Sequence, residues 1–215
     1  MLKLFEHNTL NVNDIGEEQT AVEVKNLNLW FGNKHVLNDI SMRIPKNKIT
    51  ALIGQSGCGK TTTLRSIAGL EHPQEGDIFI GETRVNGLAP ADRDIAFVFQ
   101  FYALYPHLTV YDNIAFPLKA AKVAKSDIEE RVFSVAQMLR IEHILNRKPR
   151  LLSGGEMQRV AIGRSMIRRP TVFLMDEPMS NLDAKLRVEM RSELKRLQQQ
   201  LGTTAIYVTH DQVEA

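Results

Sequence analysis

The stretch Gly54-Gln55-Ser56-Gly57-Cys58-Gly59-Lys60-Thr61, followed by Thr62, decides the fold of this 215-residue chain. It fits the pattern of Gly, four residues, Gly, Lys and then Ser or Thr, in which glycines let successive backbone N–H groups point into one concavity. Lys60 is placed to reach terminal phosphates, and the Thr61 hydroxyl is placed to bind Mg²⁺. The apolar run at residues 49–53 predicts a buried strand, and residues 61–68 predict a helix. We therefore interpret residues 54–62 as a phosphate-binding loop between a strand and a helix.

Composition limits the class of protein. With 43% hydrophobic and 24% charged residues, the chain is typical of a soluble globular protein of about one domain. The net charge of +2 is too small to indicate a nucleic-acid partner. Cys58 is the single cysteine, which fits a reducing compartment, and its place in the loop indicates packing rather than thiol chemistry. No apolar run reaches the ~18–20 residues that span a bilayer, so we expect at most a peripheral role at a membrane.

Hydrophobic patterning predicts one α/β domain with a strand-rich part and a helix-rich part. Residues 1–20 lack periodicity and are interpreted as a flexible leader or a weak edge strand. Residues 21–44 alternate as short strands, Val22–Val24, Leu27–Phe31 and Ile40–Ile44, which predicts an antiparallel sheet. Helical patterns dominate residues 101–168, and the later strands alternate with helices, which predicts a mainly parallel sheet with covered faces.

Two helix starts are predicted from capping residues. Ser126-Asp127-Ile128-Glu129 has the capping-box pattern and predicts a helix through about Arg140. Asp183 is expected to cap a long helix. The apolar stripe of that helix is Leu186, Met190, Leu194, Leu197 and Leu201.

A second nucleotide-binding motif lies in residues 172–177. The apolar run Val172-Phe173-Leu174-Met175 predicts a buried strand, and Asp176 follows at its carboxyl end, where it can hold Mg²⁺ through water. Glu177 is then placed to polarise an attacking water molecule. Together with the phosphate-binding loop, this run predicts a nucleotide-hydrolysing site.

The stretch Leu152-Ser153-Gly154-Gly155-Glu156-Met157-Gln158-Arg159, called the signature below, adds a second anion-seeking helix start. One phosphate-binding loop already holds one nucleotide. A second site for a γ-phosphate therefore suggests that the signature faces another subunit. With this stretch the sequence resembles the ATP-binding subunits of ABC transporters, from about Val22 to Ala215. The resemblance implies a P-loop NTPase of α/β class, an ABC-type nucleotide-binding domain with an antiparallel β subdomain and a helical subdomain at about 101–168.

The resemblance also implies individual roles, with ATP and Mg²⁺ as cofactors. Phe31 would stack on adenine, with Trp30 as the alternative. The nucleotide contacts would come from Gly54, Gln55, Ser56, Gly57, Cys58, Gly59, Lys60, Thr61, Thr62, Ser153, Gly154 and Gly155. Magnesium would be held by Thr61, Gln100 and Asp176, and the catalytic residues would be Glu177, His210 and Gln100. Residues 180–183 resemble the loop that crosses the dimer interface, and Glu156 replaces the glutamine that is common after the signature glycines.

The transported substance is suggested by several stretches. Residues 91–96, 100–107, 113–118 and 182–187 look like the carbohydrate-import branch, which includes maltose, trehalose and glycerol-phosphate importers. Residues 22–63 look more like the phosphate-import branch, so the chain is interpreted as a possible mosaic. A sugar importer is favoured. A phosphate-import subunit, a soluble ABC-type ATPase that does not transport, and an inactive fragment are the alternatives.

The resemblance implies partners and a location. Two copies would pair with ATP at their interface, and integral membrane permease subunits would contact the region after Gln100. A solute-binding protein outside the cytoplasm would act indirectly, no nucleic acid is involved, and the chain would lie at the cytoplasmic face of the inner membrane. Sugar-branch subunits continue beyond the position of Ala215, so we expect that the end of the domain and any regulatory domain are absent.

Overall fold

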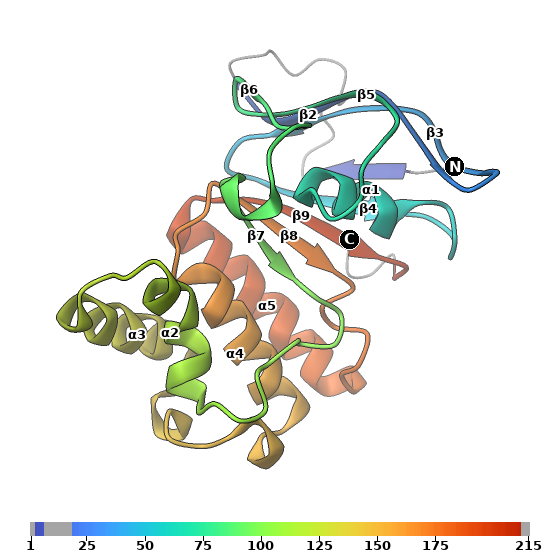
Figure 1. Ribbon diagram of the computed structural model, residues 1–215. Coiled ribbons are helices and arrows are strands. Elements are labelled where there is room, and N and C mark those ends of the chain that lie inside the picture. The colour runs from blue at the N-terminus through green and yellow to red at the C-terminus, as the bar shows by residue number, and fades with distance from the viewer. Residues whose placement is uncertain (1–2, 7–18, 212–215) are drawn as a thin grey trace. The chain divides into compact units, whose positions relative to one another are not determined.

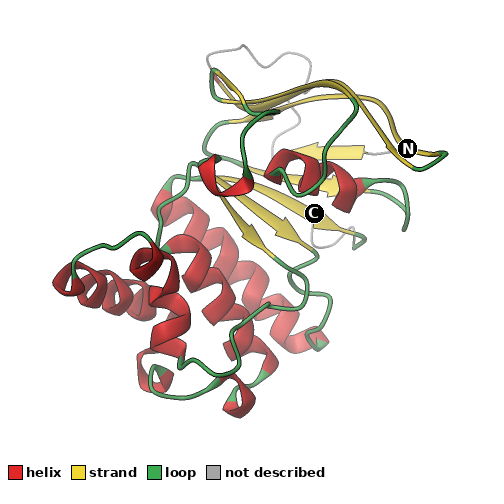
Figure 2. Ribbon diagram, viewed as in Figure 1, coloured by secondary structure: helices red, strands yellow, loops and turns green. Residues whose placement is uncertain are grey.

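The structure is a computed structural model that describes residues 3–6 and 19–211. The chain divides into two compact units, each described by itself below. The first comprises Met1–Phe97, Thr171–Glu177 and Gln198–Ala215, and the second comprises Val98–Pro170 and Pro178–Leu197. The strands belong mainly to the first unit, while α2, α3 and α4 belong to the second. Figure 2 draws the strands in yellow and the helices in red. Most of the expected leader, residues 1–2 and 7–18, lies outside the described residues.

The first unit contains a four-stranded antiparallel sheet with the strand order β3-β2-β5-β6. Its strands are β2 (Thr20–Phe31), β3 (Lys34–Pro45), β5 (Glu75–Ile80) and β6 (Thr83–Arg84). The two short strands expected at residues 22–24 and 27–31 are one strand, β2, with a register shift between Val24 and Leu27. Asn26 lies within this shift and has a φ of +48°. The resulting bulge interrupts the alternation of buried and exposed residues, which is why the sequence pattern predicts two short strands here.

A five-stranded sheet in the same unit has the order β1-β4-β9-β8-β7. It comprises β1 (Lys3–Glu6), β4 (Ile49–Ile53), β7 (Ile95–Val98), β8 (Val172–Asp176) and β9 (Thr204–Thr209). β9 pairs in parallel with both β4 and β8, and β1 pairs antiparallel with β4 at the sheet edge. The carboxyl ends of β4 and β8 therefore lie at the same edge, where Gly54 and Glu177 follow.

Helix α1 (Lys60–Ala68) lies between the two sheets of this unit (Figure 1). Its buried side chains Leu64, Ile67 and Ala68 belong to one apolar cluster with residues of both sheets, among them Val22 and Leu174. Burial of a leucine or isoleucine side chain contributes roughly 1.5–3 kcal/mol. The core thus fixes α1, and with it the loop that precedes α1.

A buried cation anchors the carboxyl end of α1. The guanidinium of Arg93 is 2% exposed and donates hydrogen bonds to the carbonyls of Ser66 (2.8 Å), Ile67 (2.7 Å) and Leu88 (3.2 Å). Its charge also faces the negative end of the helix dipole. Burial lowers the pKa of Arg93 from its usual range.

Replacing Arg93 with Met should lower the free energy of unfolding by about 2–3 kcal/mol, because buried carbonyls lose their donor. Urea denaturation of the variant and the parent measures the change. Arg84→Met is the matched control, since Arg84 pairs with Asp77 in an exposed position where ion pairs contribute at most about 1 kcal/mol. Equal effects of the two substitutions would contradict an anchoring role for Arg93.

The second unit is mainly helical. Its helices are α2 (Val110–Ala120), α3 (Lys125–Leu139), α4 (Gly154–Met166) and most of α5 (Ala184–Leu201). Short 3-10 turns occur at Glu142–Ile144 and Pro149–Leu151, and another, Pro90–Asp92, lies in the first unit. Asp183 accepts a hydrogen bond from the Leu186 N–H, as expected of a cap, but only Met190 and Leu197 of the expected α5 stripe are fully buried.

The capping box predicted at Ser126 is wrong. Helix α3 begins one residue earlier, at Lys125, and its N-cap Ala124 makes no side-chain capping bond. The Ser126 hydroxyl instead donates to the neighbouring Asp127 carboxylate. A capping serine must precede the helix in an extended conformation, and Ser126 already lies in the first turn.

None of the helices in the described residues is both long and apolar enough to cross a membrane.

Candidate functional site

The loop at residues 54–59 has a backbone that requires glycine at two places. Gly57 and Gly59 have φ values of +79° and +98°, in the left-handed region that favours glycine. A Cβ at Gly59 would also lie 2.8 Å from the Leu37 side chain. Gly59 is the N-cap of α1 and provides no side-chain cap, so the first N–H groups of the helix are left to bind an anion. This cradle fits a phosphate group.

Lys60 is only 5% exposed and lies folded against its own loop. Its Nζ donates to the carbonyls of Gly54 (2.8 Å) and Gln55 (2.9 Å), and it lies 3.8 Å from the Cys58 sulfur. These neutral partners satisfy the ammonium without neutralising its charge. An incoming phosphate would offer a stronger, charge-assisted partner.

Thr61 and Asp176 meet at the carboxyl edge of the sheet. The Thr61 hydroxyl donates to an Asp176 carboxylate oxygen at 2.7 Å. Burial raises the pKa of Asp176, and the hydrogen bond from Thr61 opposes that rise. Among the residues that the structure describes, no three His, Cys, Asp or Glu side chains cluster as a metal site. A hydroxyl and one carboxylate are instead the set that Mg²⁺ uses when phosphate oxygens supply further ligands.

Glu177 and His210 face each other beside this pair. His210 Nδ1 lies 3.4 Å from Glu177 Oε2, and the Glu177 N–H donates to the Val208 carbonyl. Glu177 has a φ of +44°, which is rare for a residue with a side chain. Such strained positions cluster at functional sites.

The two aromatic candidates for base stacking differ in availability. Trp30 stacks on His35, with ring centroids 4.1 Å apart and planes 10° from parallel. The Trp30 backbone N–H donates to the Gln74 side chain. Phe31, the next residue, is 50% exposed at the end of β2. The geometry therefore favours Phe31 over Trp30 as a ring that can accept a ligand.

The signature begins α4 in the second unit. Ser153 is the N-cap, and Gly154 and Gly155 are the first two helical residues. A Cβ at Gly155 would lie within 2.9 Å of the Leu186 side chain, so this glycine permits close packing of α4 on α5. Ser153 and Glu156 form a capping box. The sequence carries the same Ser-x-x-Glu pattern here as at Ser126, so this box is visible in the sequence.

Gln100 also belongs to the second unit. Its side-chain N–H donates to the Ser180 hydroxyl at 3.2 Å, and its backbone carbonyl accepts from the Asn181 side chain at 2.8 Å. The structure thus brings Gln100 to the loop predicted at the dimer interface. The predicted residues fall into two groups: Phe31, residues 54–62, Asp176, Glu177 and His210 lie in the first unit, whereas Gln100, Ser153, Gly154 and Gly155 lie in the second.

The segment after Gln100 is held by a residue that the sequence did not reveal. Tyr102 and Ala103 both have positive φ values, and Arg164 of α4 donates to both of their carbonyls at 3.0 and 2.7 Å. The Arg164 guanidinium also lies over the Tyr105 ring, 5.4 Å from its centroid. Desolvation lowers the pKa of Arg164. The helix of the signature therefore fixes this segment directly.

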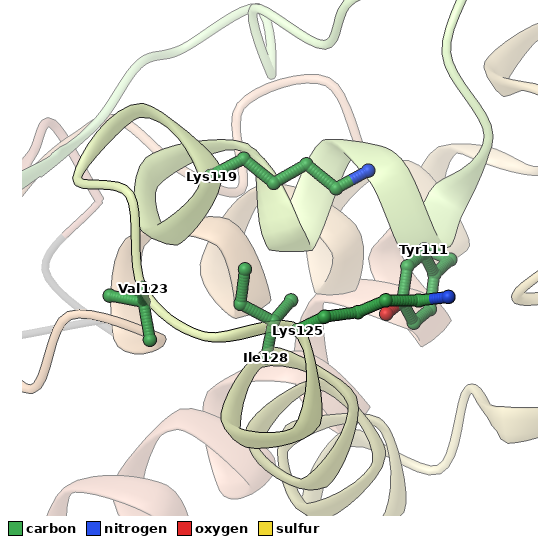
Figure 3. A pocket seen from close by; sticks show the side chains of 5 residues that line it. All are labelled: Tyr111, Lys119, Val123, Lys125 and Ile128. Atoms are coloured by element: carbon green, nitrogen blue, oxygen red, sulfur yellow. The ribbon is translucent and has the colours of Figure 1, made fainter.

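A pocket of about 370 Å³ lies elsewhere in the second unit, between α2 and α3 (Figure 3). Its lining residues are Tyr111, Lys119, Val123, Lys125 and Ile128. Lys119 pairs with Asp112, and Lys125 lies near Glu129. No residue predicted for the site lines this pocket, and its charges are already paired on the surface.

A family model described as ABC transporter matches residues 37–180, which include the phosphate-binding loop, Gln100 and the signature. The chain belongs to the ABC transporter family. This membership and the strand and helix arrangement confirm the predicted fold class, an ABC-type nucleotide-binding domain.

Named relatives point to the carbohydrate-import branch. The chain is 58% identical over 200 residues to the trehalose/maltose import ATP-binding protein MalK of Thermococcus litoralis, covering 89% of this chain and 54% of that protein. It is 59% identical over 186 residues to the sn-glycerol-3-phosphate import ATP-binding protein UgpC of Cupriavidus pinatubonensis, covering 86% and 50%. The chain thus spans about half the length of these curated relatives. They match the predicted resemblance to carbohydrate importers rather than to phosphate importers.

A solved structure extends the comparison. The chain is similar, with a TM-score of 0.78 and 32% sequence identity, to a dimeric ATP-binding cassette in a post-hydrolysis state bound to ADP and Pi. The similarity covers 90% of both chains.

Proposed function

We propose that this chain binds and hydrolyses ATP and thereby powers an ABC importer for a sugar or a related small solute. The observation that carries the proposal is the meeting of Thr61 with Asp176 beside the Glu177–His210 pair, at the end of the phosphate-binding loop. This arrangement combines an anion cradle, a magnesium site and a base. The names of the relatives supply the importer class.

Each residue of the first unit has a role in this proposal. The N–H groups at the start of α1 and Lys60 bind the β- and γ-phosphates. Thr61 and Asp176 would hold Mg²⁺, and the ion would supply charge neutralisation at the phosphates. Glu177 accepts a proton from the attacking water, and His210 orients Glu177 and contacts the γ-phosphate. Phe31 stacks on the adenine ring.

The signature supplies the remaining γ-phosphate contacts from a partner copy. In the proposed homodimer, Ser153, Gly154 and Gly155 of one chain contact the γ-phosphate bound by the other, and residues 180–183 lie at the interface. Support comes from the dimeric relative bound to ADP and Pi. Gln100, already bonded to Ser180, would add a contact to Mg²⁺ and the attacking water.

Membrane partners follow from the importer class. Permease subunits would dock on the helical subdomain at about 101–168, where Phe101 is 73% exposed after Gln100. The chain would then act at the cytoplasmic face of the membrane, with a solute-binding protein on the other side. The phosphate-import and soluble ATPase alternatives are not favoured, because the named relatives import sugars and glycerol phosphate.

Lys60→Ala should weaken ATP binding about ten- to hundredfold, the range of about 1.5–3 kcal/mol for hydrogen bonds to charged groups. Titration with a fluorescent ATP analogue measures the affinity, and the Mg-ATP turnover of the unaltered chain tests hydrolysis directly. Exposed Lys46 provides the control, as Lys46→Ala removes the same charge outside the loop. Unchanged ATP affinity in Lys60→Ala, or an unaltered chain that binds no ATP, would overturn the loop assignment.

A further inference from the structure

Glu156 occupies the hydrogen-bond donors of the signature serine. Its Oε2 accepts from the Ser153 backbone N–H at 2.7 Å and from the Ser153 hydroxyl at 2.8 Å. The Ser153 hydroxyl oxygen in turn accepts from the Glu156 N–H at 3.3 Å. One carboxylate oxygen therefore receives both donors that Ser153 possesses.

This arrangement conflicts with the role proposed for Ser153 in the dimer. A serine hydroxyl has one proton to donate, so Ser153 cannot give it to Glu156 and to a γ-phosphate at the same time. The Glu156 carboxylate is also an anion at the helix start that is meant to attract an anion. The backbone hydrogen bond from Ser153 keeps the pKa of Glu156 below its usual range, so the side chain is ionised at neutral pH.

A second place for the carboxylate lies close by. The other Glu156 oxygen, Oε1, is 3.9 Å from a guanidinium nitrogen of Arg147. The Arg147 side chain is about half exposed, while its backbone is fixed by hydrogen bonds to Ile144 and Val110. A small rotation would let Glu156 exchange Ser153 for Arg147 without leaving a charge unpaired.

We propose that Glu156 competes with the γ-phosphate of a partner copy for the Ser153 hydroxyl. The Glu156 carboxylate must move from Ser153 to Arg147 before the signature closes on ATP held by that copy. The proposal rests on the proposed ATP-dependent pairing of two chains. It assigns Glu156 the role of weakening that pairing, and Arg147 the role of receiving the displaced carboxylate. Glutamine at position 156 would keep the capping geometry but would lack the charge.

The test measures the dimer dissociation constant by sedimentation with saturating Mg-ATP. Glu177→Gln is the parent chain, so that ATP persists. Adding Glu156→Gln should tighten the dimer roughly tenfold, the scale of one charge-assisted contact. Glu130→Gln, the same charge change at an exposed position on α3, is the matched control and should leave the dimer unchanged. Urea denaturation verifies that each variant is folded.

Arg147→Gln separates competition from a general charge effect. It should weaken the dimer when Glu156 is present and have no effect in a chain that already carries Glu156→Gln, because no carboxylate then needs a partner. Equal weakening in both backgrounds would mean that Arg147 contacts the nucleotide itself, and would overturn the exchange. If the parent chain pairs and Glu156→Gln leaves its dimer dissociation constant unchanged, this proposal alone is overturned. A folded parent that stays monomeric with Mg-ATP overturns the pairing and the proposal together.

Discussion

Glu177→Gln should slow ATP hydrolysis by about 10²-fold or more while ATP binding persists, the scale expected when a general base is removed. An amide has nearly the size of a carboxylate but cannot accept the proton of an attacking water. The substitution does not change the backbone N–H of residue 177, which donates to the Val208 carbonyl, so the turn after β8 should keep its conformation. Single-turnover hydrolysis and analogue titration, measured on the same preparation, separate the two effects.

Glu189→Gln is the control for this experiment, since Glu189 is an exposed residue of α5. Its turnover should equal that of the unaltered chain. Near-normal turnover in Glu177→Gln would remove the base assignment from Glu177. His210, whose Nδ1 lies 3.4 Å from the Glu177 carboxylate, would then be the residue to replace next.

The first unit was largely predictable because its signals are local. The glycines of residues 54–59 and the apolar runs of β4 and β8 each determine a backbone conformation within a few residues. The parallel neighbours β4, β9 and β8 then bring the loop and Asp176 to one edge of the sheet. The hydrogen bond from Thr61 to Asp176, between residues 115 positions apart, is a consequence of that topology.

Local patterns fail where two segments have the same sequence pattern but different structures. Ser126 and Ser153 are both followed by glutamate three residues later, yet only Ser153 caps a helix. The two helices differ in which residue is the last extended one before the helix. This residue is Ala124 before α3 and Ser153 before α4, with ψ values of 143° and 163°. A pattern of four residues does not determine which residue is the last extended one.

Buried arginines could not be predicted for a different reason. Arg93 and Arg164 bond to carbonyls 26 or more residues away in the sequence, and the sequence around each arginine does not identify these partners. The carbonyls come within reach only once α1 and the segment after Gln100 have their final backbone positions. Long-range anchors of this kind are consequences of the fold.

Ser153→Asp should abolish ATP-dependent pairing of the Glu177→Gln chain. Aspartate caps a helix about as well as serine, so α4 should still form. Its carboxylate, however, would stand where a partner's γ-phosphate is proposed to bind, next to the negative charge of Glu156. Two like charges about 4 Å apart repel by several kcal/mol at the effective dielectric of a protein surface, about ten- to a thousandfold in affinity.

Ser153→Asn isolates charge from capping in this experiment. Asparagine also caps helices well and is neutral, so the Asn chain should retain most of the pairing that the Asp chain loses. Sedimentation with and without Mg-ATP compares the two, and urea denaturation of each verifies an intact fold. If both variants pair as well as the parent, no γ-phosphate lies near residue 153, and the composite site is wrong for this chain. If both fail to pair while folded, the Ser153 hydroxyl itself is required, because neither aspartate nor asparagine carries a hydroxyl that can donate to the γ-phosphate while accepting from the Glu156 N–H.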